Sequence, residues 1–564
     1  MRNTADRQDK GNLIRRILIL ALIGGLAALM IRWATLQKIV DAGPDEYMRF
    51  IVSRFIYEHG KLPTGFDAEA RDGNWGFSYA VYPFLASIVQ ALYMKIGSLF
   101  GTETRTILAA ARMASVTFLT VAASFTFLAG RKLFGGWKGI CFAVLVVFLP
   151  GFHYLGSYIN CDSLALMAVS IILYAWVCAL KDGWRWKTCI ILAVGIGICA
   201  LSYYNAYGWI LASILYYFIL AAAKREYTQK GMAPSSTGGG KNKYSREGSN
   251  PLLSMPPADR RRGQRNDAMH RPRRDKNAEA FLNEKAVFLK KTVLICLIVI
   301  GISAWFFIRN AYLYDGDFLG FRTARNLMEQ YAIPALKPSV RQSPAEMGWS
   351  LRDLFWYRDP GWPHIWIKLA AVSFVGTFGY FNIFMKEIVN RIYIIFIGIT
   401  LALGLVTVRR FSPVRKMEVT LQTVDDASLK TTDKDSQRTT DDVSKRTTDD
   451  VSKRTTDGND RLSAYKKQSI RMLNPEGIFN LAMLLAMCIP VFLFVWYAYF
   501  SDLQAQGRYM ISAVYAVMYF VICGCDFLLQ KLHVRNTEIV YMILSGIWTA
   551  GALYNFFTVV LPAY

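Results

Sequence analysis

Long apolar stretches, separated by short polar connections, dominate this chain of 564 residues. Each stretch holds roughly 17–25 residues with few charges, which is the length that a helix needs to cross a hydrocarbon core about 30 Å thick. The pattern predicts an all-α membrane protein built as a bundle of about 11 transmembrane helices. The expected spans cover residues 14–33, 107–127, 140–158, 163–180, 188–204, 206–223, 292–312, 388–408, 478–500, 510–529 and 539–559.

The positions of the basic residues give this bundle an orientation. Lys and Arg flank alternate ends of the spans, and such residues concentrate in cytoplasmic loops. We therefore expect a cytoplasmic N-terminus and a C-terminus on the outer side. The first span lacks a small-residue cleavage site and ends in Arg32-Trp33, which indicates a retained helix rather than a removed signal peptide. The flanking residues include Arg15, Arg131, Lys181, Lys224, Lys290, Arg409 and Lys531.

Two further apolar stretches, residues 77–100 and 367–384, are ambiguous by hydropathy alone. If the first of them crossed the membrane, every short basic loop from Arg131 to Lys224 would move to the outer side. Leaving it out keeps these loops cytoplasmic. We therefore expect both stretches to form interfacial or re-entrant helices that pack against the outer face of the bundle.

Two long polar segments interrupt the spans. Residues 224–291 are strongly basic, and residues 411–471 repeat an eight-residue unit with one valine, Thr-Thr-Asp-Asp-Val-Ser-Lys-Arg. Neither can bury a core, so we expect a disordered basic cytoplasmic insert and a low-complexity cytoplasmic spacer. They divide the chain into an N-terminal membrane half (1–223) with a first outer loop (34–106), two central helices (292–410) with a long outer loop (313–387), and the C-terminal membrane helices (472–564).

Composition adds two exclusions. The net charge of +24 invites a nucleic-acid interpretation, but the positive residues lie in the polar segments and short loops, as cytoplasmic flanks of membrane helices do. We therefore expect no nucleic-acid partner. Eight of the nine cysteines lie inside apolar stretches and only Cys161 lies near a loop, so no disulfide framework is predicted.

Once the spans are oriented, the distinctive polar residues fall together on the outer side. They lie at helix ends and in very short connections, where an ionisable group is costly unless it is paired or used. Loops that touch water are polar in any case, but this explanation is weaker for such positions. The set comprises Asp45, Glu46, Asn160, Asp162, Arg309, Asn310, Gln506, Arg508 and Tyr509.

Carboxylates beside arginines at a membrane boundary suit transfer from a lipid-linked phosphate. A carboxylate can take a proton from an acceptor hydroxyl, which typically contributes about 10²–10⁴-fold to the rate. Arginine binds phosphate through charge-assisted, often bidentate contacts. Arg112, early in the second span, either reaches such a phosphate or extends to the interface. Trp356 and Trp362 either contact a sugar or lipid or belong to the aromatic belt.

Several motifs, in order along the chain, resemble a known group of enzymes. The motif Gly43-Pro44-Asp45-Glu46 in a first outer loop, followed by interfacial helices and a multi-helix bundle, looks like the GT-C superfamily of membrane glycosyltransferases. That superfamily includes protein O-mannosyltransferases and aminoarabinose transferases. The chain is most similar to a bacterial multi-pass membrane-protein family of unassigned substrate within it. The other matching motifs are residues 60–65, 157–162, 308–310, 373–380 and 506–509.

The resemblance implies inverting transfer of a sugar from a polyprenyl-phosphate donor to an acceptor outside the cytoplasm, in synthesis of cell-envelope polysaccharide or glycoconjugate. By analogy, Asp45 is the general base and Glu46 assists it or holds the acceptor. Asn160 and Asp162 orient the acceptor or the base, and Arg508, with Arg309, binds the donor phosphate. No obligatory metal or other cofactor is expected, because the histidines are scattered. The expected partners are the lipid-linked donor, a glycan, lipid or protein acceptor, and membrane lipids.

Two other functions stay open at this point. A transporter or flippase of a lipid-linked saccharide would place ionisable groups near the bilayer midplane, on broken or repeated helices. Here the charges gather at one face, and no internal repeat is evident across the membrane spans. A non-catalytic relative that organises envelope assembly would be favoured by loss of the Asp45-Glu46 pair, which is intact.

Overall fold

The structure, a computed structural model, describes residues 2–37, 40, 42–229, 273–408, 414–422 and 465–564. Within these ranges the protein is a helical membrane bundle, and nine helices are long and apolar enough to cross a bilayer. Two segments expected to span, 140–158 and 188–204, form shorter helices. These are α5 (Gly136–Val147) and α8 (Trp186–Ala200). The nine longer spans are Gly11–Leu36, Thr104–Phe134, Asp162–Asp182, Tyr204–Ala223, Leu282–Leu313, Glu387–Thr407, Pro475–Phe500, Gly507–Lys531 and Thr537–Ala563.

A proline explains why the first of the two short helices ends early. Pro150 has no backbone N–H and cannot continue a helix, but its fixed φ suits the first helical position. Accordingly α5 ends at Val147, and a five-residue helix, α6 (Pro150–Tyr154), begins at Pro150. Hydropathy alone predicts a continuous span through this break, because the residues on both sides are apolar. The break lets the chain turn into the connection that carries Asn160 and Asp162.

The remaining elements follow the same logic of apolar helices joined by short polar connections. The first loop contains α2 (Glu46–His59), η1 (Ala68–Ala70), η2 (Tyr79–Val81) and α3 (Leu85–Gly97). The other elements are α1 (Arg2–Leu36), α4 (Thr104–Phe134), α7 (Asp162–Asp182), η3 (Tyr204–Ala206), α9 (Tyr207–Gln229), α10 (Arg273–Leu313), α11 (Phe321–Tyr331), η4 (Pro334–Leu336), α12 (Leu351–Trp356), α13 (Trp366–Gly376), β1 (Thr377–Phe378), β2 (Ile383–Phe384), α14 (Glu387–Val408), β3 (Val414–Gln422), β4 (Tyr465–Leu473), α15 (Pro475–Phe500), η6 (Gly507–Ala513), α16 (Val514–Lys531), α17 (Thr537–Asn555), η7 (Phe556–Val560) and α18 (Leu561–Ala563).

The two ambiguous apolar stretches contain only short helices. Residues 77–100 include α3, with 13 residues, and residues 367–384 include most of α13, with 11 residues, followed by the antiparallel pair β1–β2. Neither helix is long enough to cross a hydrocarbon core about 30 Å thick at 1.5 Å per residue. Both pack on the bundle, α3 against α4 and α13 against α6 and η6. The first loop therefore has the short helices that the sequence predicts.

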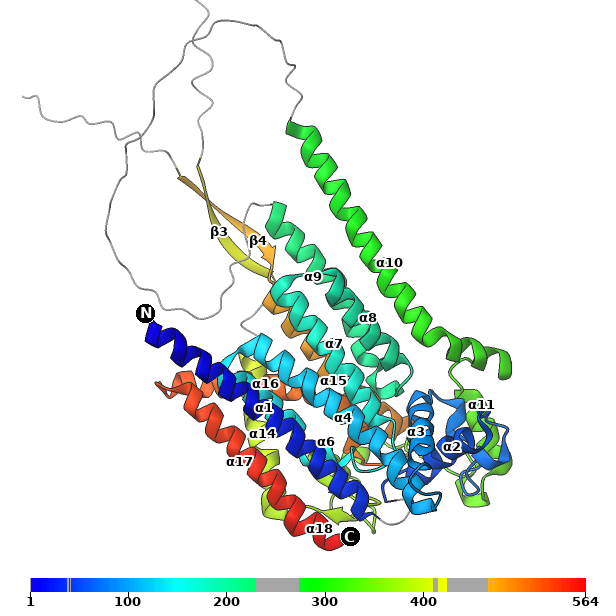
Figure 1. Cartoon of the computed structure of the whole chain (residues 1–564). Helices are drawn as coiled ribbons and strands as arrows, with labels where there is room; N and C mark the ends of the chain where they lie inside the picture. The colour runs from blue at the N-terminus through cyan, green and yellow to red at the C-terminus, as the bar shows by residue number, and fades with distance from the viewer. Residues whose placement is uncertain (1, 38–39, 41, 230–272, 409–413, 423–464) are drawn as a thin grey trace, which may run out of the picture.

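The centre of the bundle is made by α5, α7 and α16. Residues 139–147 of α5 are all buried, and the large side chains Trp176 and Tyr515 are fully enclosed. The outer helices α10, α14 and α17 instead expose apolar side chains, as lipid-facing helices do. Figure 1 shows α2, α3 and α11 gathered at one end of the bundle, with β3–β4 at the opposite end. We call the end with α2, α3 and α11 the loop end.

The described parts of the two polar segments contain regular structure. Residues 224–229 continue α9 and residues 273–291 begin α10, so helix extends from both sides into the segment expected to be disordered. In the second segment β3 and β4 pair as antiparallel strands, with Val414 opposite Leu473 and Gln422 opposite Tyr465. The sequence did not predict these strands. The predictions for residues 230–272, 409–413 and 423–464 lie outside the described residues.

Candidate functional site

The turn Gly43-Pro44-Asp45-Glu46 is held in one conformation by its neighbours. A Cβ on Gly43 would lie 2.5 Å from the ring of Tyr158, so only glycine fits under that ring. Asp45 has φ 63° and ψ 8°, the left-handed conformation that Asp adopts more readily than most residues. Such a conformation costs on the order of 1 kcal/mol or more and persists only where the surroundings fix it. The turn therefore directs two adjacent carboxylates in different directions.

The carboxylate of Glu46 points into the protein. It is fully buried and pairs with Arg112, whose Nε and Nη2 donate to its two oxygens at 2.8 and 2.9 Å. The backbone N–H groups of Ala42 and Ile159 donate to the same carboxylate at 2.8 and 2.9 Å. Glu46 thus joins the first loop, α4 and the connection before α7. Arg112 neither extends to the interface nor points at open space, because it also donates to the carbonyls of Ala34, in the last turn of α1, and of Gln37, just after that helix.

Asp45 points the other way and forms an ion pair with Arg508, a residue 463 positions later in the chain. About a quarter of the Asp45 side chain is exposed, against 13% for Arg508. Burial raises the pKa of the Asp45 carboxyl, but the charges of Arg508 and Arg49 outweigh burial and the net pKa lies below its ordinary value. Asp45 is therefore ionised at neutral pH, as a proton acceptor must be.

A second carboxylate reaches the same arginine. Asp162, the first residue of α7, is almost fully buried, and its Oδ2 lies 3.8 Å from Nη1 of Arg508. Arg508 also donates from Nε to Gln506 at 2.6 Å and from Nη1 to the carbonyl of Pro44 at 3.4 Å. Cys161 lies beside these charges, but burial raises its pKa to about 12, so it stays a neutral thiol.

Arg49 completes this cluster, and the sequence analysis did not select it. It lies one helical turn after Asp45 on α2, is 8% exposed, and its guanidinium lies 3.9 Å above the centroid of Tyr79. Burial lowers the pKa of Arg49, but its neighbours, which include Asp45 and Asp162, raise it more, and the net pKa is above its ordinary value. The signal in the sequence is the four-residue spacing between Asp45 and Arg49, which places both on one side of a helix start.

Helix α13 fixes the segment that carries Arg508. Ser373 accepts a hydrogen bond from the backbone N–H of Gly507 at 2.7 Å and donates to the carbonyl of Ala505 at 3.0 Å. A Cβ on Gly507 would lie 2.3 Å from the backbone N of Phe374, so η6 approaches α13 as closely as backbone permits. Gly151 of α6 packs on the carbonyl of Phe374 in a similar way. The motif of residues 373–380 therefore has a structural reason: it positions Arg508.

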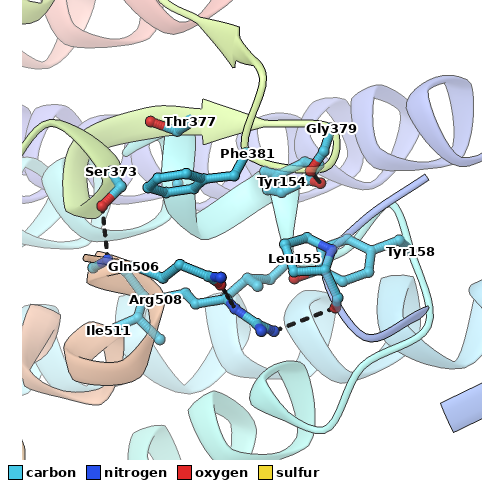
Figure 2. A pocket seen from close by; sticks show the side chains of 13 residues that line it. Tyr154, Leu155, Tyr158, Ser373, Thr377, Gly379, Phe381, Gln506, Arg508 and Ile511 are labelled. Carbon is cyan, nitrogen blue, oxygen red and sulfur yellow. Dashed lines mark hydrogen bonds between the residues drawn. The ribbon is translucent and has the colours of Figure 1, made fainter. Parts of the chain in front are cut away.

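A pocket opens beside Arg508, between this arginine and the β1–β2 hairpin (Figure 2). Its empty volume is about 390 Å³, counted to its open mouth. The walls combine aromatic rings with polar groups, which suits a ligand that has both a ring and hydroxyls. In Figure 2 the guanidinium of Arg508 bonds to Gln506 and to the carbonyl of Pro44. The lining residues are Pro44, Gly151, Tyr154, Leu155, Tyr158, Ser373, Thr377, Gly379, Phe381, Gln506, Gly507, Arg508 and Ile511.

Three of the sequence-predicted residues support the site from a distance. Asn160 is fully buried, accepts from the backbone N–H of Ser163 at 2.8 Å, and donates to two carbonyls before α7. Asn310 donates to the carbonyl of Val81 at 2.8 Å, and Arg309 donates to that of Pro63 at 2.6 Å. Arg309 also lies over the ring of Phe84. Arg309 and Asn310 thus anchor the first loop to α10, and neither forms a hydrogen bond or ion pair with Asp45.

Of the other residues selected from the sequence, one lies beside Arg508 and two have different surroundings. Tyr509 lies next to Arg508, with its ring 5.0 Å from that guanidinium and stacked on Tyr497. Trp356 is 65% exposed at the loop end, whereas Trp362 packs in a small apolar cluster around Trp366. The described residues contain no group of three or more His, Cys, Asp or Glu side chains that could hold a metal ion. Independence from a metal stays a prediction.

Comparison with known proteins gives the chain a relative. Residues 81–235 match the dolichyl-phosphate-mannose-protein mannosyltransferase family. The matched segment runs from η2 to just past α9, so it contains Arg112, Tyr158 and Asp162 but neither Asp45 nor Arg508. None of the curated proteins compared with the chain matches it. Over this segment of 155 of the 564 residues the chain is similar to the dolichyl-phosphate-mannose-protein mannosyltransferases, and the nine apolar helices of the described part make it a multi-pass membrane protein.

Proposed function

We propose that the protein transfers a single sugar, with inversion, from a polyprenyl-phosphate donor to an acceptor on the extracytoplasmic side of the cell membrane. The observation that carries this proposal is the ion pair between Asp45 and Arg508, beside an open pocket that Arg508 lines. An ionised base and a phosphate-binding cation are thereby in contact, with open space beside them. The name of the matching family makes mannose the first sugar to test.

The proposed chemistry needs few groups. An acceptor hydroxyl attacks C1 of the sugar from the face opposite the phosphate, and the new C1–O bond forms as the bond from C1 to the phosphate oxygen breaks. The hydroxyl proton passes to Asp45, and the leaving polyprenyl phosphate keeps the bonding electrons. Arg508 holds that phosphate through charge-assisted hydrogen bonds, and Gln506 orients Arg508.

The other candidate residues take supporting roles in this proposal. Glu46 holds the turn that presents Asp45, since both of its oxygens are occupied by Arg112 and backbone N–H groups. Asp162 shares Arg508 with Asp45 and so sets the orientation of the guanidinium. Asn160 and Asn310 fix the connections on either side. The lipid tail of the donor would lie in the bilayer beside the loop end.

The topology in this proposal places the loop end outside the cytoplasm and the N-terminus inside. The distribution of basic residues supports it, as does the position of α2, α3 and α11 at the end opposite β3–β4 (Figure 1). A cysteine introduced at exposed Trp356 should therefore react with a membrane-impermeant maleimide added to intact cells, in a background whose exposed native cysteines, Cys296 and Cys488, are replaced. Labelling only after permeabilisation would place the loop end inside.

The variant Asp45→Asn tests the reaction. Membranes that contain the full chain are supplied with polyprenyl phosphomannose carrying a labelled sugar, and with the analogous phosphosugars of glucose and galactose. We expect the wild-type protein to release polyprenyl phosphate in step with sugar transfer, and Asp45→Asn to lower the rate by about 10²-fold or more. Normal transfer by Asp45→Asn would reject the base assignment. Movement of the intact donor across the membrane, without cleavage, would favour the flippase.

A further inference from the structure

Arg49 is a buried cation without a hydrogen-bonding partner. Within the described part of the chain, its guanidinium makes no hydrogen bond or ion pair, and Nε is enclosed with nothing to donate to. The guanidinium lies over the face of Tyr79, 3.9 Å from the ring centroid. Arg508, by contrast, donates to Gln506, Asp45 and the carbonyl of Pro44. Two arginines of one cluster thus differ: each guanidinium nitrogen of Arg508 has a hydrogen-bond partner, whereas no guanidinium nitrogen of Arg49 forms a hydrogen bond within the described residues.

An enclosed guanidinium with unused donors is costly. Leaving a buried charged donor unsatisfied costs a few kcal/mol, so native proteins retain such a group chiefly where a ligand completes it. The charges around Arg49 show which ligand fits. Two arginines, Arg49 and Arg508, face two carboxylates, Asp45 and Asp162, and these charges cancel when the site is empty. An added anion can therefore bind Arg49 without breaking the Asp45–Arg508 pair.

We propose that Arg49 binds the phosphate of the lipid donor and neutralises the negative charge that develops on it during transfer. This inference rests on the proposed function, which gave the phosphate to Arg508 alone. In the donor the phosphate is a diester with one negative charge. When the bond from C1 to oxygen breaks, the phosphate becomes a monoester and gains a second negative charge. Arg49, whose donors are free, contacts that additional charge, whereas Arg508 remains with Asp45.

The role proposed for Arg49 predicts which of two phosphate ligands the protein binds more tightly. A group that interacts with the second charge distinguishes a phosphate monoester from a diester. Arg49 should therefore favour polyprenyl monophosphate, the product, over a diester of the same length. Since the charge develops in the transition state, loss of Arg49 should lower kcat more than it raises KM for the donor. A residue that only supports the fold would weaken both ligands alike.

The test uses two soluble probes that differ by one charge. Farnesyl phosphate is a monoester and farnesyl methyl phosphate is a diester, and their affinities for the purified full chain are measured at pH 8. The variants are Arg49→Gln, Arg49→Lys and the matched control Arg54→Gln. Arg54 lies on the same helix but is half-exposed and pairs with Glu58 at 3.2 Å. We expect the wild type and Arg54→Gln to prefer the monoester by about tenfold or more.

The outcomes separate this inference from the proposed function. Arg49→Gln should lose the preference, and Arg49→Lys, which keeps a charge without the planar fork, should retain part of it. The inference would be overturned, and the proposed function left standing, if Arg49→Gln preferred the monoester as strongly as Arg54→Gln does. An equal loss of affinity for both probes in Arg49→Gln would have the same meaning. If Arg49→Gln fails to fold, an unchanged preference in Arg49→Lys, with unchanged kcat, overturns it. Wild-type protein that binds neither probe would reject the proposed function itself.

Discussion

At the scale of single residues, adjacent carboxylates have separate tasks because one backbone angle turns them apart. The left-handed Asp45 directs its own side chain toward Arg508, and the next residue, Glu46, enters the protein toward Arg112. The sequence predicts an acidic pair at the outer boundary but treats its two members as near equivalents. Their partners come from positions 66 and 463 residues away, which no local pattern records.

Glu46→Gln should destabilise the protein strongly. The substitution leaves Arg112 buried without its counter-ion, and removing one partner of a buried pair typically costs about 3–5 kcal/mol. Thermal or denaturant unfolding of the purified protein measures this loss. Glu387→Gln is the matched control, because the Glu387–Arg391 pair is more than half exposed and an exposed pair contributes little to stability. Equal stability of the two variants would contradict a buried ion pair at Glu46.

The pH below which the rate of sugar transfer falls should depend on Arg508. The proposed reaction requires the Asp45 carboxylate, whose pKa is held below its ordinary value by Arg508 and Arg49 against the effect of burial. The rate therefore persists until the pH falls through that lowered pKa. In Arg508→Gln the pKa rises, so the acid limb of kcat/KM for the donor should move to higher pH. Arg508→Lys keeps the charge, so the acid limb should stay near its wild-type position. If the limb moves in neither variant, the pH dependence does not report the ionisation of Asp45.

At the scale of elements, the site depends on how closely helices approach. Segment η6 contacts α13 through Gly507, and α6 contacts the same turn of α13 through Gly151. The β1–β2 hairpin that follows α13 then closes one wall of the pocket. Arg508 is one residue beyond the closest of these approaches. Small changes in helix packing should therefore displace the guanidinium.

Gly507→Ala tests that dependence. The added methyl group would meet backbone atoms of α13 at 2.3–2.7 Å, so the segment must shift. We expect a loss of about 1–3 kcal/mol in unfolding free energy and a larger loss of donor affinity, because Arg508 moves with it. Gly546→Ala on α17 is the control, since a Cβ there meets nothing within 4 Å. Wild-type donor affinity in Gly507→Ala would show that η6 tolerates displacement.

The comparison of sequence with structure is clearest at this scale. Long apolar runs predict the nine long spans because twenty apolar residues in a row have few other stable arrangements. They overestimate the lengths of α5 and α8, since hydropathy does not detect a helix break between apolar residues, such as the break at Pro150. The sequence predicts that Asp45 and Arg508 lie on the same side of the membrane. The roles of Arg112 and Arg49 could not, because they depend on contacts between different helices.

At the scale of the whole molecule, the described borders of the second polar segment lie away from the proposed site. The strands β3 and β4 that border the second segment lie at the end of the bundle opposite α2, α3 and α11 (Figure 1). Arg508 follows that segment in the chain, yet it returns to the loop end through α15. Activity should therefore depend on the register of α15 and α16 rather than on the polar sequence before them.

A hairpin replacement tests this independence. Because Gln422 lies opposite Tyr465 in the β3–β4 pair, residues 423–464 can be replaced by Asn-Gly, a two-residue connection suited to antiparallel strands. The shortened protein should fold and retain transfer within about twofold, since no residue of the site is removed. The measurement is sugar transfer normalised to the amount of folded protein. A well-folded but inactive protein would show that the segment contributes to function.

Because 463 residues separate Asp45 from Arg508, the ribosome synthesises the two partners at different times. At a synthesis rate of about 5–20 residues per second, Arg508 emerges on the order of half a minute to a minute and a half after Asp45. During that interval Glu46 already has its partner Arg112 within reach, whereas Asp45 has only Arg49, four residues later, of the two arginines in its cluster. A nascent chain therefore carries a base without its distant partner. The proposed site becomes complete only when about the last tenth of the chain enters the membrane, so truncated chains should accumulate as inert proteins rather than as partly active ones.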